Sequence, residues 1–284
     1  MGAIRKRLTT NDREYDTLAA MKILVTVKEV AEVDDEFDIS GLDIAESSLE
    51  YDLNEWDDYA IEEAVQTSEE HGDVEVVVVT VGPERSEETI RMALAKGADR
   101  AVRVWDDAIE EAQFLDIETK AELIAAVAEE EEPDLVLSGV QAGDDSNGAT
   151  GVALAEELGF EWAAVVNELG LDTEAGVASV HRELEGGIEE LTDVDLPAVL
   201  TIQTGINEPR YASLRGIRQA QRKPLETSTL EDLGLDESVV SSAIERTSMY
   251  EPESESDATV WEGSADETAG ELAAFLRDKG VVEG

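Results

Sequence analysis

The sequence predicts an α/β fold: a doubly wound, mostly parallel sheet with added antiparallel strands and an extended C-terminal arm. Apolar runs of strand length alternate with helical segments from residue 22 to about residue 159, the order expected of a parallel sheet covered on both faces. Strand-like segments separated by glycines then follow between residues 163 and 202, which favours antiparallel pairing. After about Glu226 the chain is polar and acidic until a last helical stretch.

The first half of the chain supplies the alternating strands and helices. VEVVVVTV at residues 74–81 is a β-branched run suited to a buried parallel strand, and Gly82 and Pro83 end it. Ser86 is a candidate cap for the next helix, which Gly97 ends. The expected elements are strands at 22–27, 74–81, 98–105 and 134–139 and helices at 53–70, 86–96, 117–132 and 152–159.

In the second half of the chain, successive strands replace the alternation of strands and helices. Strands are expected at 163–171, 177–184, 187–194 and 198–202, with turns at Gly176 and at Gly186 and Gly187. A terminal helix is expected at 269–279, because Leu272, Phe275 and Leu276 fall on one helical face.

The composition excludes several classes of protein. The 284 residues include 69 Asp and Glu against 21 Lys and Arg, a formal charge of -48, yet 42% of them are hydrophobic, enough to bury a core. Acidic interaction proteins concentrate such charge in tails, whereas here it is spread along the chain. In molar salt the Debye length falls to ~3 Å and screens the repulsion, so we expect a halophilic, cytoplasmic protein.

Three kinds of site or partner are excluded by the same composition. Cysteine is absent, which excludes disulfides, thiolate catalysis and Cys-ligated metals. Phosphates would be repelled by the net charge, so nucleic acid is not an expected partner. No apolar run approaches the ~20 residues that span a bilayer, so no membrane insertion is expected.

The strongest local signal is DLVLSGVQAGDDSNGATG at residues 134–151, a strand that runs through small residues into a helix. Backbone amides of such a loop, with the helix N-terminus behind them, can bind a phosphate. The segment is neither a Walker A loop nor a GxGxxG fingerprint. Asp144 and Asp145 would repel a phosphate unless they face ribose hydroxyls or cap the helix. An ordinary capped turn is an equally good interpretation of the spacing alone.

Other polar motifs carry less weight. Asn54 and Asp57 precede a helix in LNEWDDYAIEEAV and could be only caps. Arg91 fits a plain strand-turn-helix unit better than a phosphate contact. His181 is expected on the same strand face as Glu183 and far from the other histidine, His71, which makes a weak case for a metal site. No nucleophile elbow supports a Ser-His-Asp triad.

A basic segment, GINEPRYASLRGIRQAQRKP at residues 205–224, stands out from the acidic chain. Its apolar residues lie among arginines, a mixture typical of protein interfaces. A loop held by intramolecular salt bridges is an equally good interpretation. Its basic residues are Arg210, Arg215, Arg218, Arg222 and Lys223.

Taken together, these segments resemble the β subunits of electron transfer flavoproteins. HRELEGGIEELTDVDLPAVLTIQTGINEPRYASLRGI at residues 181–217 is similar to the family's signature region. LNEWDDYAIEEAV, VGPERSEETIRMALAKGADR and DLVLSGVQAGDDSNGATG occur in the family's order and spacing. The resemblance runs from Met21 to about Leu235.

The resemblance implies a heterodimer with an α subunit that holds most of the FAD, and an AMP bound by this chain. It implies an electron carrier without a catalytic acid or base, which takes electrons from acyl-CoA-type dehydrogenases and passes them to a membrane quinone oxidoreductase. Glu183 matches a glutamate near the electron-transfer region, and Pro209, Arg210, Tyr211 and Leu214 match a loop that docks the dehydrogenase. The implied AMP site comprises Thr26, Asn54, Glu55, Trp56, Asp57, Val81, Gly139, Val140, Gln141, Ala142, Gly143, Asp144, Asp145, Ser146, Asn147, Gly148, Ala149 and Thr150.

The resemblance leaves alternatives for the nucleotide. Family members have QAIDDDxNQTG with AMP, or QAIDGDTAQVG with a second FAD and bifurcation of electrons from NADH. In QAGDDSNGATG here, Asp145 and Thr150 favour the AMP form, whereas Gly143, Gly148 and Ala149 match neither. Glu55 also replaces the family's usual proline. A bifurcating subunit and a stand-alone nucleotide-binding module remain the alternative functions.

Three parts of the chain are expected. Residues 1–20 are polar and lack the apolar segment of a secretory signal, so we expect a disordered or mis-annotated extension with Met21 as the natural start. Residues 21–225 form a Rossmann-like, adenine-nucleotide-binding α/β domain. Residues 226–284 form the acidic arm with its terminal helix.

Overall fold

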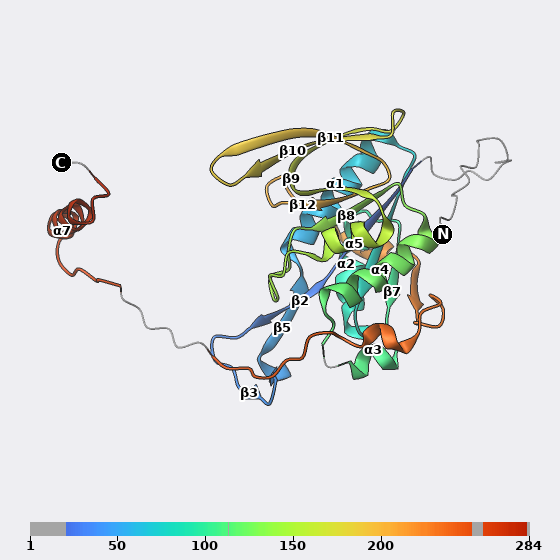
Figure 1. Cartoon of the computed structure of the whole chain (residues 1–284), viewed down its shortest axis with the longest axis horizontal. Helices are drawn as coiled ribbons and strands as arrows, with labels where there is room; N and C mark the ends of the chain where they lie inside the picture. The colour runs from blue at the N-terminus through green and yellow to red at the C-terminus, as the bar shows by residue number, and fades with distance from the viewer. Residues whose placement is uncertain (1–20, 113, 252–257, 283–284) are drawn as a thin grey trace, which may run out of the picture. The chain divides into compact units, whose positions relative to one another are not determined.

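A nine-stranded sheet forms the centre of the larger of two units (Figure 1). The computed structural model describes residues 21–112, 114–251 and 258–282, so the expected extension at 1–20 lies outside the described residues. The first unit ends at Thr247 and the second begins at Ser248. The strands of the large sheet are β1 (Met21–Thr26), β6 (Val74–Val81), β7 (Arg100–Val104), β8 (Leu135–Gly139), β9 (Glu161–Asp172), β10 (Val177–Leu184), β11 (Ile188–Asp195), β12 (Ala198–Ile202) and β13 (Leu225–Ser228).

The strand order is β11-β10-β9-β12-β8-β1-β6-β7-β13. Every pairing from β9 to β13 in this order is parallel, whereas β10 pairs antiparallel with both β9 and β11. The chain leaves β1 toward β6 and returns to its other side at β8, which makes β1 and β8 the topological switch point of the sheet. The predicted fold class is therefore confirmed.

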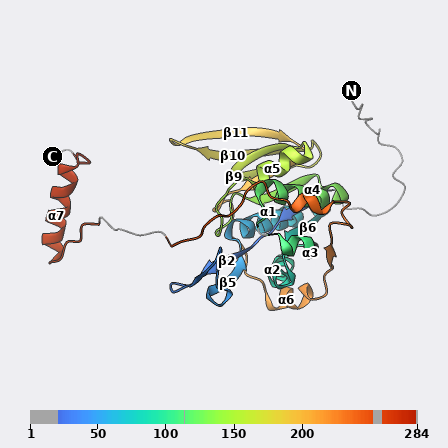
Figure 2. The same cartoon turned by 60° about the horizontal axis from the view of Figure 1, so that its bottom comes forward.

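Helices cover both faces of the sheet. The face of Ile23 and Val25 packs against α1 (Glu55–His71), α2 (Glu87–Lys96) and α6 (Leu214–Ala220), and α6 lies beside α2 (Figure 2). The face of Leu24 packs against α3 (Asp107–Glu111), α4 (Ile117–Glu131) and α5 (Thr150–Leu158). Because successive side chains of β1 are buried on opposite faces, its apolar run is continuous rather than alternating.

Several elements are not among those that the sequence predicts. Residues 29–53 form two small antiparallel pairs, β2 (Glu29–Val33) with β5 (Leu49–Leu53) and β3 (Ile39–Ser40) with β4 (Asp43–Ile44). The described residues also contain short 3-10 turns, η1 (Glu46–Ser48), η2 (Glu84–Ser86) and η3 (Glu237–Val240).

The predicted cap of α2 is wrong. Ser86 lies at the N-cap position, but η2 precedes the helix and leaves Ser86 in a helical conformation. Its hydroxyl donates to Glu29 Oε1 at 3.1 Å instead of accepting from the first turn of α2. The predicted end of α2 at Gly97 agrees with the structure, in which Gly97 has a φ of 149°.

The first unit extends past residue 225, where the sequence predicts the start of the acidic arm. β13 adds an edge strand beside β7, and Leu230 beyond it is only 2% exposed in the core shared with α4 and α5. Leu233 and Leu235 pack against the same cluster. The chain up to Thr247 therefore belongs to the compact unit.

The second unit contains the terminal helix α7 (Ala265–Asp278), which begins earlier than predicted. Ser264 and Glu267 form a capping box that fixes this start. Trp261 packs edge-on against Phe275 with ring centroids 5.4 Å apart. Within the described part of the chain, no helix is long and apolar enough to cross a membrane.

Leu230→Ala is expected to lower the free energy of unfolding of the first unit by roughly 2–5 kcal/mol, because the truncated side chain would leave a cavity in the core. Urea unfolding in concentrated KCl, followed by circular dichroism, measures the change. Leu272→Ala is the matched control, since Leu272 is 44% exposed in α7. Equal effects of the two substitutions would show that the segment after β13 is not part of the core.

Candidate functional site

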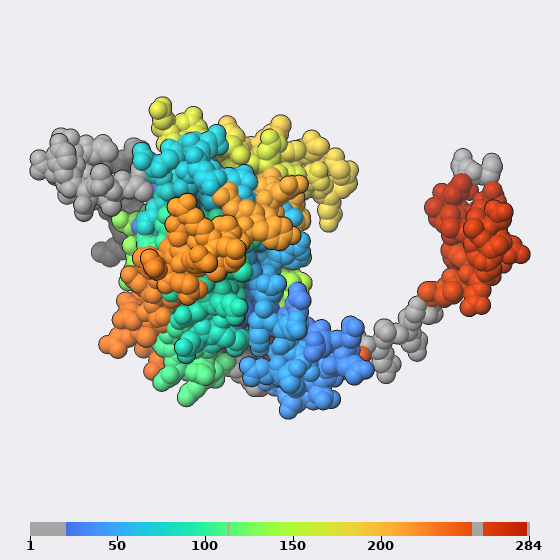
Figure 3. Space-filling model, turned by 180° about the vertical axis from the view of Figure 1, so that it is seen from behind, coloured from blue at the N-terminus to red at the C-terminus, as the bar shows by residue number. Residues whose placement is uncertain are grey.

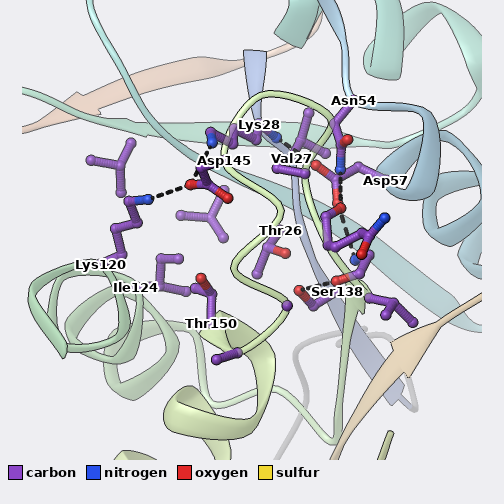
Figure 4. Close-up of a pocket in the computed structure, with 18 of the residues that line it drawn as sticks. Thr26, Val27, Lys28, Asn54, Asp57, Lys120, Ile124, Ser138, Asp145 and Thr150 are labelled. Carbon is purple, nitrogen blue, oxygen red and sulfur yellow. Dashed lines mark hydrogen bonds and ion pairs between the residues drawn. The ribbon is translucent and has the colours of Figure 1, made fainter. Parts of the chain in front are cut away.

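A pocket lies at the carboxyl ends of β1, β6 and β8, at the switch point of the sheet (Figure 4). Its volume is about 110 Å³. The strands supply its floor, the loop after β8 borders it, and α4 and the start of α5 close the other sides. The lining residues are Thr26, Val27, Lys28, Asn54, Asp57, Val79, Val81, Leu115, Lys120, Ile124, Ser138, Gly139, Val140, Gln141, Ala142, Asp145, Gly148, Ala149 and Thr150.

Most residues of the predicted AMP site lie in this lining. Six of them do not, namely Glu55, Trp56, Gly143, Asp144, Ser146 and Asn147. Trp56 instead donates from Nε1 to Gln203 Oε1 at 3.1 Å. The lining also contains residues that the sequence reasoning missed: Val27, Lys28, Val79, Leu115, Lys120, Ile124 and Ser138. Strand alternation with Val81 could have identified Val79, whereas no local pattern marks the two lysines.

Asn54 joins the start of α1 to the loop after β8. Its Nδ2 donates to the carbonyl of Gln141 at 2.9 Å, and its Oδ1 accepts from the Gly143 N–H at 3.2 Å. The side chain makes no cap hydrogen bond to α1, although Asn54 occupies the N-cap position. The interpretation of Asn54 as only a helix cap is therefore wrong, because its polar atoms bind the loop.

Asp57 joins α1 to both strands of the switch point. Its carboxylate accepts from the Lys28 N–H at 2.8 Å and from the Gly139 N–H at 3.0 Å, and the residue is 4% exposed. Burial raises the pKa of Asp57 to about 7, although these two hydrogen bonds and that of Asn54 act in the opposite direction. A Cβ at Gly139 would lie 2.5 Å from Asp57 Oδ1, so only glycine allows this approach.

Asp145 lies between two lysines from opposite sides of the pocket (Figure 4). Lys28 Nζ and Lys120 Nζ each donate to its Oδ2 at 2.9 Å, and Lys28 Nζ also binds Asp144 Oδ1 at 2.5 Å. Burial alone would raise the pKa of Asp145, but the bonds from Lys120 and Lys28 hold it well below its ordinary range. The two acidic residues of the loop are thus neutralised by cations rather than used as helix caps.

The remaining lining suits a nucleoside phosphate. Among the described residues, the N–H groups of Gly148 and Ala149 have no acceptor, and α5 begins directly after them. Unpaired amides beside a helix N-terminus favour an anion. Thr26 and Thr150 border the same cavity, and their hydroxyls can bind sugar or phosphate oxygens (Figure 4). Val79, Val81, Leu115 and Ile124 provide an apolar wall for a base.

The basic segment at residues 205–224 lies across α1 and α2 on the surface (Figure 3). Arg210 Nε binds Glu62 Oε2 at 2.8 Å and Arg210 Nη1 binds Glu69 Oε1 at 2.7 Å, both on α1. Lys223 Nζ donates to backbone carbonyls at the end of α2, and Arg91 of α2 donates to the carbonyl of Ala220, the last residue of α6, and to that of Lys223. For Arg210 the interpretation as a loop held by intramolecular salt bridges is borne out, whereas Lys223 holds the segment through backbone carbonyls instead of acids.

Other side chains of the same segment face outward. Tyr211 is 99% exposed and Leu214 is 79% exposed. The described residues offer no ion-pair or hydrogen-bond partner to the guanidinium groups of Arg215, Arg218 and Arg222. The inner side of the segment is therefore held on the helices, whereas its outer side is apolar and basic.

The strand β10 carries Glu183, the last of the predicted site residues, and His181. His181 Nδ1 lies 3.5 Å from Glu168 Oε2, and its Nε2 lies 3.6 Å from Glu189 Oε2. Glu183 pairs across the sheet with Glu189 on β11. Over the part of the chain with a described structure, no group of three or more His, Asp or Glu side chains could hold a metal ion.

Asp57→Asn is expected to remove a pH dependence of stability. Native Asp57 keeps its proton up to about pH 7, whereas the unfolded chain loses it near the ordinary value of 3.8, so this residue's contribution to stability is lost as the pH rises through about 7. The free energy of unfolding of the natural protein, measured relative to Asp57→Asn, should fall between about pH 4 and pH 7. All other acidic residues are common to both proteins, so their effects cancel in the comparison. If the difference in free energy of unfolding between the two proteins did not change with pH, a raised pKa of Asp57 would be contradicted.

Comparison with known proteins places this architecture in a family. The model of the electron transfer flavoprotein domain matches residues 41–233. An electron transfer flavoprotein subunit beta of Methylophilus methylotrophus is 45% identical over 264 residues, 91% of this chain and 98% of that protein. The electron transfer flavoprotein subunit beta of Bacillus subtilis (strain 168) is 34% identical over 92% of this chain and 100% of its own length. The mitochondrial subunit beta of Arabidopsis thaliana is 37% identical over 82% of this chain and 90% of its own length. The chain belongs to the β-subunit family of electron transfer flavoproteins.

Proposed function

We propose that this chain binds AMP in the switch-point pocket and pairs with an α subunit that carries FAD, as an electron carrier rather than a catalytic enzyme. The observation that supports AMP most directly is the pocket itself, in which an apolar wall, two threonine hydroxyls and the unpaired amides of Gly148 and Ala149 meet. The base would lie against the valines of β6 and Ile124. The phosphate would lie at the loop before α5.

FAD supplies the electron transfer when it is bound, and the protein supplies position and electrostatics. In this proposal the residues of this chain neither donate nor remove protons during the reaction. Glu183 on β10 is the residue proposed to lie near the electron-transfer region. The antiparallel strands β9, β10 and β11 extend the sheet beyond the pocket, and exposed apolar side chains such as Ile188 and Leu191 are available for subunit contact.

The outer surface of the basic segment is the proposed docking site for acyl-CoA-type dehydrogenases. Leu214 and Tyr211 project from a backbone held by the two ion pairs of Arg210, so little ordering entropy remains to be lost when a partner binds. Pro209 restrains the residue before it to an extended form. Electrons would then pass to a membrane quinone oxidoreductase, in a salt-rich cytoplasm that screens the acidic surface.

Nucleotide content is the first test. The complex, captured from its own cells in concentrated KCl and then denatured, is expected to release about one FAD and one AMP per heterodimer, because each proposed site holds one nucleotide. Mass spectrometry identifies and counts them. Two FAD without AMP would instead indicate the bifurcating form that oxidises NADH, and the absence of flavin would indicate a stand-alone nucleotide-binding module.

Leu214→Ala is expected to raise the KM of an acyl-CoA-type dehydrogenase for the heterodimer by roughly 5- to 30-fold, since a buried apolar anchor contributes about 1–2 kcal/mol to an interface. Steady-state flavin reduction by the dehydrogenase and its acyl-CoA substrate gives this KM. Ile244→Ala is the control, because Ile244 is 59% exposed and lies outside both the basic segment and the strands proposed for subunit contact. Flavin content should be unchanged in both variants, and an unchanged KM in Leu214→Ala would exclude this docking surface.

A further inference from the structure

The strand β9 is irregular at the point where its pairing changes. Its first residues pair parallel with β12, and its last residues pair antiparallel with β10 (Figure 1). The register shifts on both sides, between Leu200 and Ile202 on β12 and between His181 and Arg182 on β10. A strand with extra residues relative to its neighbours contains a β-bulge. We call residues 164–167 of β9 the β9 bulge.

Val165 in the β9 bulge has a backbone conformation that valine disfavours. Its φ is 64°, in the left-handed region, where a β-branched side chain is rare. In the described part of the chain, the other non-glycine residues with a positive φ are Glu132 and Ser146, and neither is β-branched. Such a conformation persists only where surrounding contacts stabilise it.

The peptide bond between Ala164 and Val165 is held from both neighbouring strands. Thr201 Oγ1 on β12 accepts from the Val165 N–H at 2.9 Å, and Arg182 Nη1 on β10 donates to the Ala164 carbonyl at 3.3 Å. Thr201 is 5% exposed, and a Cβ on Gly151 of α5 would lie 2.6 Å from its Cγ2. The hydroxyl of Thr201 is therefore confined between α5 and the β9 bulge.

The hairpin of β10 and β11 joins the parallel sheet through β9. Glu183 directly follows Arg182 in this hairpin, and Arg182 also pairs with Glu190 on β11. The exposed side chains of Ile188 and Leu191, which are proposed to contact the α subunit, belong to the same hairpin. Because a bulge bends and twists its strand, the orientation of the hairpin depends on the backbone of the β9 bulge.

We propose that Thr201 is a positioning residue, whose hydroxyl holds Val165 in its left-handed conformation and so orients the hairpin of β10 and β11 for contact with the α subunit. Without this acceptor, the valine backbone leaves the left-handed region in part of the molecules. The α subunit then binds only the remaining fraction, and its apparent affinity falls in proportion. The contact role rests on the proposed pairing with an α subunit, whereas the hold on the hairpin is a property of this chain alone.

Thr201→Val tests the hydroxyl, because valine keeps the shape of the side chain but offers the Val165 N–H no acceptor. Hydrogen exchange of the full chain and its Kd for the FAD-loaded α subunit are both measured at one fixed, high KCl concentration. Amides of β9 and β10 are expected to exchange about tenfold faster, and the Kd to rise about tenfold, if about a tenth of the molecules keep the native bulge. Thr201→Ser retains the hydroxyl and should restore both quantities.

Val165→Gly separates the strained backbone from side-chain packing. Glycine adopts a positive φ without steric cost, so combining Val165→Gly with Thr201→Val should return exchange and Kd to within about threefold of the natural protein. Thr89→Val is the matched control, since Thr89 is 7% exposed in α2, which packs on β6 and β7, and it should change neither quantity. A double variant as impaired as Thr201→Val alone would overturn the proposal, because the defect would then arise from packing.

The two measurements separate this inference from the proposed function. Unchanged exchange and an unchanged Kd in Thr201→Val would overturn the positioning role and leave the pairing with the α subunit intact. Faster exchange of the hairpin with an unchanged Kd would overturn the role of Thr201 in subunit contact. Failure of the natural protein to bind the α subunit would overturn the proposed pairing and the contact role with it, and the exchange rates would still decide whether Thr201 holds the hairpin.

Discussion

The buried carboxylate of Asp57 is the contact on which the rest of the pocket depends. It binds the N–H groups of Lys28 and Gly139, and so fixes α1 against the ends of the parallel strands β1 and β8, where the order of the strands reverses. The two backbone N–H groups that donate to this carboxylate offset part of the cost of burying it, yet burial still raises the pKa of Asp57. The tight approach requires glycine at position 139, and Asn54 one turn earlier then ties down the loop that follows.

Cations are scarce in this chain, with 21 lysines and arginines against 69 acids, and their placement matters accordingly. Lys28 and Lys120 neutralise the carboxylates beside the pocket, and Arg210 attaches the basic segment to α1. Such pairs near the surface contribute little to stability individually. These ion pairs instead fix the positions of loops, because each pair holds a loop that the surrounding acidic surface would otherwise repel.

Much of the fold could be predicted from the sequence, and part of the site could not. The apolar runs of β1, β6 and β8 identify a buried parallel sheet, and the small-residue loop after β8 marks the edge at which the pocket lies, because both signals are local. Lys28 and Lys120 were missed because their meeting at Asp145 depends on strand order, which no local spacing encodes. Ser86 was misassigned because a 3-10 turn, with ordinary sequence, precedes α2. Leu230 lies in a polar segment, and its burial depends on β13 pairing with β7.

The helix α1 connects the pocket to the exposed segment. Asp57 in its first turn binds the switch point, whereas Glu62 and Glu69 further along bind Arg210. From Asp57 to Glu69 the helix rises about 18 Å, so the pocket and the basic segment are both attached to a single helix. At the other side of the segment, a Cβ on Gly216 would lie 2.3 Å from the Ala95 carbonyl oxygen, so α6 can pack this closely on α2 only with glycine there. The position of Leu214 relative to the pocket is therefore set by helix packing rather than by the loop's own conformation.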